Sequence, residues 1–329
     1  MLRSIIAAIP LLLAMPALAA DNVLANLLLL QSVEERVASI GYRLATSAGD
    51  LCSDTTMLAG IQIHDASQYG PAESRQLAAA FGPGPWPKVL ALAAGGAAAR
   101  AGVRANDSIL AIDGTPAPAT GRQQSYDRVW YTLALLDHAM ADGHAVLTLE
   151  RDGKPLTIDV AGDRGCASRF SFTTSRDPQG KADGSYVVIT SGLVTFAPKD
   201  AELAAAMAHE LAHNILHHRQ RLDAAGVSRG ILQSFGRNAR LTRETETEAD
   251  RLSVYLLDRA GYPPTAALSF WDRFRKASSD LLVFTHPSSG NRIRTLQTEI
   301  ARIEAAKARG EVPRFVPDSG QASGNRKSE

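Results

Sequence analysis

The residues most able to do chemistry lie in one short stretch, where four of the eight histidines of the chain fall between positions 209 and 218. Two of them flank a glutamate in the sequence His209-Glu210-Leu211-Ala212-His213. The surrounding residues, 201–221, are rich in helix formers and contain no Gly or Pro, so we expect one long helix. Residues four apart lie on the same face of a helix, and both imidazoles can therefore bind one zinc ion.

Glu210 lies beside this pair of histidines, where it can take a proton from a water molecule activated by zinc. A solvated helix face that carries these residues by chance is the alternative. The apolar residues nearby favour a buried helix, and they are Ala206, Met207, Leu211, Ile215 and Leu216. His217 and His218 fit either a position near the metal or a solvated helix end that favours positive charge. We assign neither of them as a ligand.

A catalytic zinc ion usually has three protein ligands and one open position, so a third donor must come from elsewhere in the chain. Glu246 and Asp250 stand four apart in the segment ETEAD, in a second helix that we expect to face the first. Glu246 is the expected third ligand, and Asp250 is expected to accept a hydrogen bond from the far ring nitrogen of His209, which fixes its tautomer. Two nearby carboxylates are competing donors, Glu244 and Glu248.

The elements that must position these residues alternate between helical and strand-like sequence. Apolar residues recur at intervals of three and four through 22–47, which predicts a helix that docks on the rest of the chain. Alternation of apolar and polar residues predicts a strand at 57–64, and the Gly- and Pro-rich run at 82–87 indicates a domain boundary. Residues 88–160 contain short apolar runs separated by Asp-Gly turn signals, which is typical of a small β-rich module.

Composition limits the class of protein. The chain has 329 residues, 45% of them hydrophobic, which suits about two folded units and excludes a disordered or collagen-like chain. The formal net charge of +1 gives no reason to expect a polyanionic partner, so we predict no nucleic acid ligand. Abundant Ala and an aromatic content of only 6% favour long helices over an all-β design.

The first twenty residues are typical of a secretory signal peptide that is removed by cleavage. Arg3 precedes an apolar run at 5–14, and residues 17–19 (Ala-Leu-Ala) offer the small side chains that a signal peptidase accepts. A membrane anchor is the alternative, but a run interrupted by Pro10 and Pro16 falls short of the ~20 apolar residues of a spanning helix. We therefore predict a periplasmic or secreted protein with no integral membrane segment after cleavage.

Export to an oxidising compartment would allow the two cysteines of the chain to pair. Cys52 and Cys166 are the only candidates, so the connectivity of the predicted disulfide is fixed. Two buried free thiols are the alternative. Neither cysteine belongs to a CxxC pair, so neither is expected to bind a metal.

Three motifs occur in order along the second half of the chain: AAMAHELAHNILHH, ETEADRLS and THPSSGNRI. Together they resemble the M48 metallopeptidases over residues 169–300. The resemblance implies a gluzincin fold and one zinc ion per chain, bound by His209, His213 and Glu246. It also implies that His286, in the third motif, either polarises the scissile carbonyl or caps the zinc of a latent enzyme.

The same resemblance implies that the strand within 186–194 forms the edge of a sheet along the cleft, where it can pair with an extended substrate. The residues assigned to this pairing are Val187, Val188, Ile189 and Thr190. Just before this strand, many members of the family have Asn-Ala, whereas this chain has Lys181-Ala182. Residues 219–241 are polar and do not form a membrane hairpin, which argues against the integral-membrane branch of the family.

Residues 97–116 (AAARAGVRANDSILAIDGTP) resemble the PDZ domains of bacterial periplasmic proteases. This resemblance implies that the module binds an extended peptide at an exposed sheet edge. The chain departs from the pattern because no Gly-Leu-Gly-Phe carboxylate-binding loop precedes the first strand. A PDZ fold that serves only as a spacer is the alternative.

These observations predict an α+β fold, in which a mainly helical zincin-like metallopeptidase domain with a small edge sheet is interrupted by a β-rich PDZ-like domain. The expected divisions are a signal peptide (1–20), an N-terminal helix and strand packing on the catalytic domain (21–82), the PDZ-like domain (83–162), the metallopeptidase domain (163–310) and a disordered tail (311–329). The predicted activity is zinc-dependent hydrolysis of peptide bonds in unfolded or misfolded proteins. The alternative is a PDZ-bearing chaperone or adaptor with a latent or structural zinc site.

Overall fold

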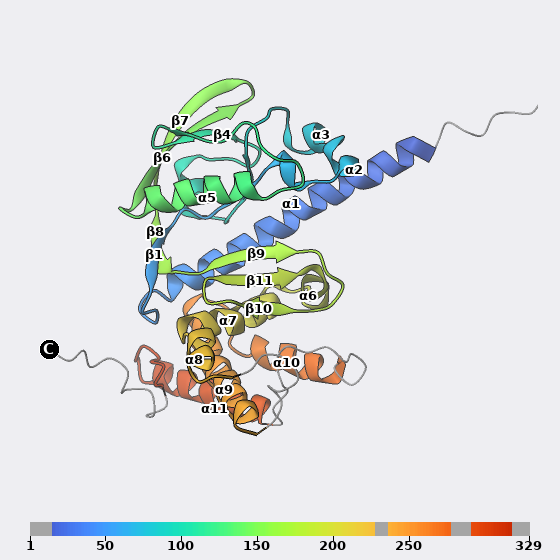
Figure 1. The fold of residues 1–329 in the computed structure, drawn as a ribbon. Coiled ribbons are helices and arrows are strands. Elements are labelled where there is room, and N and C mark those ends of the chain that lie inside the picture. Colours follow the sequence, from blue (N-terminus) through green and yellow to red (C-terminus); the bar gives the residue numbers. More distant parts are fainter. Residues whose placement is uncertain (1–14, 228–235, 278–290, 318–329) are drawn as a thin grey trace, which may run out of the picture.

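A computed structural model describes residues 15–227, 236–277 and 291–317 (Figure 1). The described residues form an α+β structure with three sheets, as the sequence predicted at the level of fold class. A six-stranded sheet lies on one side of the long helix α1 (Met15–Ser47), and a three-stranded sheet with most of the helices lies on the other. A two-stranded ladder connects the two parts.

Helix α1 packs on both parts of the molecule. Its buried residues Val37, Ile40 and Leu44 join the core of the helical part, whereas Leu27 contacts a smaller cluster with Phe81 and Leu90. The predicted docking helix over 22–47 is therefore confirmed. The helix begins earlier, at Met15, so helical backbone continues through the expected cleavage region, and cleavage itself remains a prediction. Among the described helices, none combines the length and apolarity that a bilayer span requires.

The six-stranded sheet has the order β2-β3-β4-β6-β7, with β5 paired to β4. Its strands are β2 (Ile61–His64), β3 (Lys88–Leu92), β4 (Ser108–Ile112), β5 (Thr115–Pro116), β6 (His144–Arg151) and β7 (Lys154–Ala161). The connecting helices are α2 (Pro71–Ser74), α3 (Leu77–Phe81), α4 (Ala97–Ala101) and α5 (Asp127–Met140), with the 3-10 turn η1 (Ala66–Gln68). Asp152 and Gly153 both have positive φ, 52° and 73°, so they form the tight hairpin between β6 and β7 that the Asp-Gly signal predicted.

The strand expected at 57–64 is in fact two strands in two different sheets. β1 (Thr55–Leu58) pairs antiparallel with β8 (Asp163–Cys166), and β2 pairs with β3. Gly60, with a φ of 73°, separates them, because a backbone turn there interrupts the strand. The division expected at 82–83 therefore falls between two paired strands, and the six-stranded sheet includes a strand from the segment assigned to the catalytic domain.

The helical part is built on the three-stranded sheet β10-β11-β9. Its strands are β9 (Arg169–Thr173), β10 (Gly180–Ala182) and β11 (Tyr186–Thr190). Its helices are α6 (Ser191–Phe196), α7 (Asp200–Ile215), α8 (His218–Ala224), α9 (Gly236–Arg259), α10 (Ala266–Ala277) and α11 (Arg292–Ala308). One apolar cluster joins α1, the sheet and helices α7, α9, α10 and α11, so the residues of α7 and α9 lie in a fixed, buried frame.

The chain after α11 differs from the predicted tail. Residues 311–317 lie against α9, where the Phe315 ring contacts Tyr255 and the backbone carbonyl of Val316 accepts a hydrogen bond from Arg251. The polar composition of the tail did not reveal that Phe315 packs on the apolar core. The rest of the predicted tail lies outside the described residues.

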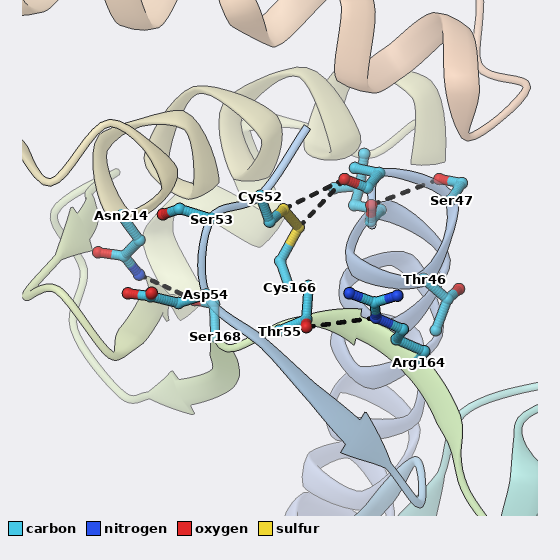
Figure 2. Close-up of a disulfide and its surroundings, with 12 residues drawn as sticks. Thr46, Ser47, Cys52, Ser53, Asp54, Thr55, Arg164, Cys166, Ser168 and Asn214 are labelled. Atoms are coloured by element: carbon cyan, nitrogen blue, oxygen red, sulfur yellow. Dashed lines mark hydrogen bonds between the residues drawn. A yellow bond between two sulfur atoms is a disulfide. The ribbon is translucent and has the colours of Figure 1, made fainter. Parts of the chain in front are cut away.

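The predicted disulfide between Cys52 and Cys166 is present, with the two Cα atoms 5.5 Å apart (Figure 2). Cys52 belongs to the turn after α1, and Cys166 ends β8, where it is the register partner of Thr55 in β1. The bridge spans 114 positions of sequence and lies where the chain leaves and re-enters the helical part. It therefore fixes both ends of the segment that carries the six-stranded sheet.

Replacing Cys52 and Cys166 together by Ser should lower the free energy of unfolding by about 4 to 5 kcal/mol, because the open chain regains the entropy of a long loop. Urea unfolding of the oxidised protein and of the variant measures this difference. Reductant should destabilise the natural sequence and leave the double variant unchanged. A midpoint that does not move when the bridge is reduced contradicts this account.

Candidate metal centre

Helices α7 and α9 pack against each other through small and aliphatic side chains. Ala204, Ala205, Ala208 and Ala212 of α7 are all fully buried, and short side chains on this helix allow close packing of its neighbours. The polar side chains of His209 and Glu246 are buried between these two helices. His209 is 0% exposed and Glu246, from α9, is 5% exposed.

Three side chains converge between the two helices. The Nε2 atoms of His209 and His213 are 3.1 Å apart. One carboxylate oxygen of Glu246 lies 3.3 Å from the first of these nitrogens, and the other lies 3.5 Å from the second. The structure thus brings together the three residues that the sequence nominated as ligands, with one possible ligand atom of each within 4.8 Å of the others.

These donors suit zinc. Tetrahedral coordination with bonds near 2.0–2.1 Å puts ligand atoms about 3.3 Å apart, which is close to the observed separations. Nitrogen and carboxylate oxygen are also the donor types of catalytic zinc sites. Glu210, Glu246 and Asp250 carry three formal negative charges against one positive charge on Arg292, and a divalent cation would balance the remaining two. The described residues at this point therefore fit a zinc ion.

Asp250 lies behind His209, as the sequence predicted. Its Oδ1 is 3.0 Å from Nδ1 of His209, so the carboxylate can fix the ring with Nε2 directed at the other two donors. Burial alone would lower the pKa of His209, but the hydrogen bonds and charges of Asp250 and Glu246 outweigh burial and raise this pKa.

Arg292, at the start of α11, connects the two acidic side chains. Its Nε donates to Asp250 at 2.7 Å, and its Nη2 donates to Glu246 at 3.0 Å. The guanidinium group lies over the Trp271 ring, 3.8 Å from its centroid, and the same ring contacts His209 edge-on. Sequence reasoning missed both residues, although Arg292 was visible as the arginine of the third motif.

The expected long helix over 201–221 is interrupted, and this was not predicted. α7 ends at Ile215, His217 adopts a left-handed conformation with φ of 51°, and α8 begins at His218. The sequence gives no sign of this break, because the left-handed residue is a histidine and the segment contains no Gly or Pro. In an unbroken helix, residues five apart face different directions. The turn instead returns His218 toward His213.

His218 forms a hydrogen-bonded chain behind His213. The Nδ1 atoms of the two rings are 2.9 Å apart, and Nε2 of His218 is 2.9 Å from Glu248. Glu248 accepts a hydrogen bond from Arg221, so of the two competing carboxylates, this one is turned to other partners. The second, Glu244, is half exposed and forms an ion pair with Arg240.

The protonation states along this chain are mutually consistent. Burial lowers the pKa of His218 in spite of Glu248. Burial would raise the pKa of Glu248, but His218 and Arg221 outweigh it and lower this pKa to about 2. A neutral His218 can accept the Nδ1–H of His213 and donate its own Nε2–H to the ionised Glu248. His213 then keeps Nε2 free of hydrogen for a metal.

Glu210 is 4% exposed and lies against the short strand β10. A Cβ atom on Gly180 would be 2.9 Å from its Cγ, so the strand approaches this side chain through a residue without a side chain. Lys181 and Ala182, which replace the family's Asn-Ala, belong to the same strand.

The prediction that Val187, Val188, Ile189 and Thr190 form an edge strand is wrong. They belong to β11, which lies between β10 and β9 and is paired on both sides. Val187 and Ile189 are fully buried, as a central strand requires. The three residues Gly180–Ala182 carried no strand signal, and they supply the edge next to Glu210. His286 lies outside the described residues.

Two histidines one helical turn apart, with a glutamate between them and a carboxylate from the facing helix, are the arrangement found at the centre of zincin-type metallopeptidases. The profile of peptidase family M48 matches residues 179–237 and 229–300. This match covers the part of the chain that carries the three motifs, and it confirms the resemblance inferred from them.

Curated relatives agree with this assignment. The chain is 31% identical over 155 residues to the mitochondrial metalloendopeptidase OMA1 of Schizosaccharomyces pombe, a match that covers 39% of this chain and 46% of the relative. It is 27% identical over 208 residues to a putative beta-barrel assembly-enhancing protease of Vibrio cholerae, covering 48% of this chain and 43% of the relative. The chain thus spans less than half the length of either relative.

Replacing His218 by Ala should weaken zinc binding about 10- to 100-fold, because His213 loses the acceptor that fixes its tautomer and ring orientation. Competition with a chromophoric chelator measures the dissociation constant. His217→Asn is the matched control, since the neighbouring imidazole contacts Ser53 instead of His213 and Asn tolerates the left-handed backbone of this position. Equal zinc affinity in the two folded variants contradicts a role for His218 at this centre.

Proposed function

We propose that this protein is a zinc-dependent endopeptidase that hydrolyses peptide bonds of unfolded or misfolded proteins. The convergence of His209, His213 and Glu246 beside the buried Glu210 carries this proposal. A bound zinc ion supplies Lewis-acid chemistry, which polarises a substrate carbonyl and lowers the pKa of water. Glu210 accepts the proton of the attacking water and returns it to the leaving amine.

The chain's own residues prepare this step. Asp250 and His218 orient the two imidazoles from behind, and Arg292 offsets the buried charge of Glu246 and Asp250. We place an extended substrate along the outer edge of β10, where backbone groups of an edge strand can pair with it close to Glu210. The role of His286 at the scissile carbonyl or as a cap remains the proposal made from the sequence.

We further propose that the protein acts in the periplasm or after secretion. The Cys52–Cys166 bridge supports an oxidising compartment, because disulfides are rare in reducing ones. The six-stranded sheet with α4 and α5 is proposed to be a PDZ-like module that captures peptide segments. A chaperone or adaptor with a latent metal site would share the zinc content and the module, but would not cleave.

Glu210→Gln should bind zinc with unchanged affinity and lose at least about 100-fold in the hydrolysis of casein, because the amide cannot accept the proton of water. Gel electrophoresis and release of acid-soluble peptides follow the reaction. Glu244→Gln, on the exposed face of α9, is the matched control and should cleave normally. A natural sequence loaded with zinc that leaves casein intact would favour the chaperone alternative.

Gly180→Ala should reduce kcat by up to about 100-fold and leave zinc affinity unchanged, because the added methyl group displaces Glu210 from its position. Steady-state kinetics on a quenched fluorescent peptide separates kcat from KM. Lys181→Ala, at the exposed next position of β10, serves as the control. Full activity in Gly180→Ala would show that this contact does not position Glu210.

A further inference from the structure

A cavity of about 620 Å³ lies between the six-stranded sheet and the three-stranded sheet, away from the metal centre. Helix α5 and strand β2 bound it on one side, β9 bounds it on the other, and α1 contributes to its wall. Figure 1 shows α5 on one side of α1 and β9 on the other. This volume is within the usual range of ligand sites in proteins.

Two strand edges face this cavity. β2 is the terminal strand of the larger sheet, and β9 is the terminal strand of the smaller one. The backbone carbonyl of Phe170 in β9 accepts a hydrogen bond from the side-chain amide of Gln62 in β2, at 2.9 Å. A side chain thus occupies a backbone acceptor that a further strand would otherwise use.

The remaining walls suit alternate side chains of an extended chain. Apolar residues line the cavity from both sides, and among them are Ile61, Ile63, Leu133, Leu136 and Phe172. Two large aromatic residues of the lining, Tyr126 and Trp130, are 55% and 52% exposed. Half-exposed aromatic rings beside an apolar cavity are typical of surfaces that contact other proteins.

The surroundings of Glu34, one of the lining residues, disfavour the charged end of a chain in this cavity. Burial raises the pKa of the Glu34 carboxyl to about 7, and the free carboxylate of a chain end would meet the same cost of desolvation there.

We propose that this cavity binds an extended internal segment of a protein chain, which adds a strand to the outer edge of β9 and displaces Gln62 from Phe170. The segment lies between the two sheets and contacts both. The sheet that receives it at β9 approaches Glu210 with its other edge, β10. The inference rests on the proposed capture of peptide segments by the PDZ-like module and specifies its site, but it does not depend on hydrolysis.

Fluorescence anisotropy tests the proposal on the full chain carrying Glu210→Gln, which separates binding from cleavage. The probe is a fluorescein-labelled peptide of about ten residues that alternates Leu or Val with Ser or Lys, acetylated and amidated at its ends. It should bind, and the same peptide with a free carboxylate should bind no more tightly. A version with alternate backbone nitrogens methylated should lose binding, because it cannot donate to β9.

Substitutions locate the binding site. Leu133→Trp fills the cavity and should weaken binding about tenfold or more, whereas Leu135→Trp, on the same helix outside the lining, should have little effect. Gln62→Ala should strengthen binding about threefold by releasing the Phe170 carbonyl. Circular dichroism checks that each variant is folded. The proposal is overturned if the blocked peptide does not bind, if Leu133→Trp binds it normally, or if Gln62→Ala weakens it.

Discussion

The ion pairs of Arg292 with Glu246 and Asp250 are the interaction on which the candidate metal centre depends. Both carboxylates are buried in an apolar contact between helices, where an uncompensated charge would cost several kcal/mol. Arg292 is itself 7% exposed and lies over Trp271, so the cation is fixed by packing as well as by charge. It also brings α11 to the back of α9, and thereby connects the C-terminal helix to the site.

Each of the two histidines needs a hydrogen-bond partner that orients its ring, and the two partners differ. His209 has a carboxylate behind it, whereas His213 has a neutral imidazole that passes the hydrogen bond to Glu248. A second carboxylate directly behind His213 would add a further negative charge to a centre that already has three. Because the His218 ring intervenes, the negative charge of Glu248 is farther from the centre, where Arg221 pairs with it. Both rings present Nε2 to the same point.

The convergence of the three proposed ligands was predictable because it follows from the spacing of residues along a helix. The spacing of His209, Glu210 and His213 requires only a helix, and the offset between Glu246 and Asp250 requires only a second one. Arg292 and Trp271 could not be placed in the same way, since their contacts depend on how α10 and α11 return to α9. The disulfide was predictable because two cysteines permit one pairing, whereas the partners of β2 and β11 depend on sheet order, which alternation of residues does not encode.

The broken helix after Ile215 shows most clearly what propensity omits. Every residue from 201 to 221 tolerates a helix, yet a continuous helix would direct His218 away from His213. A left-handed residue without Gly costs roughly 1 kcal/mol or more, and the hydrogen bonds of His218 with His213 and Glu248 can offset such a cost. Helix propensity is therefore overridden at the point where the His218 side chain is needed behind His213. The left-handed backbone at His217 is explained by these contacts and not by the local sequence.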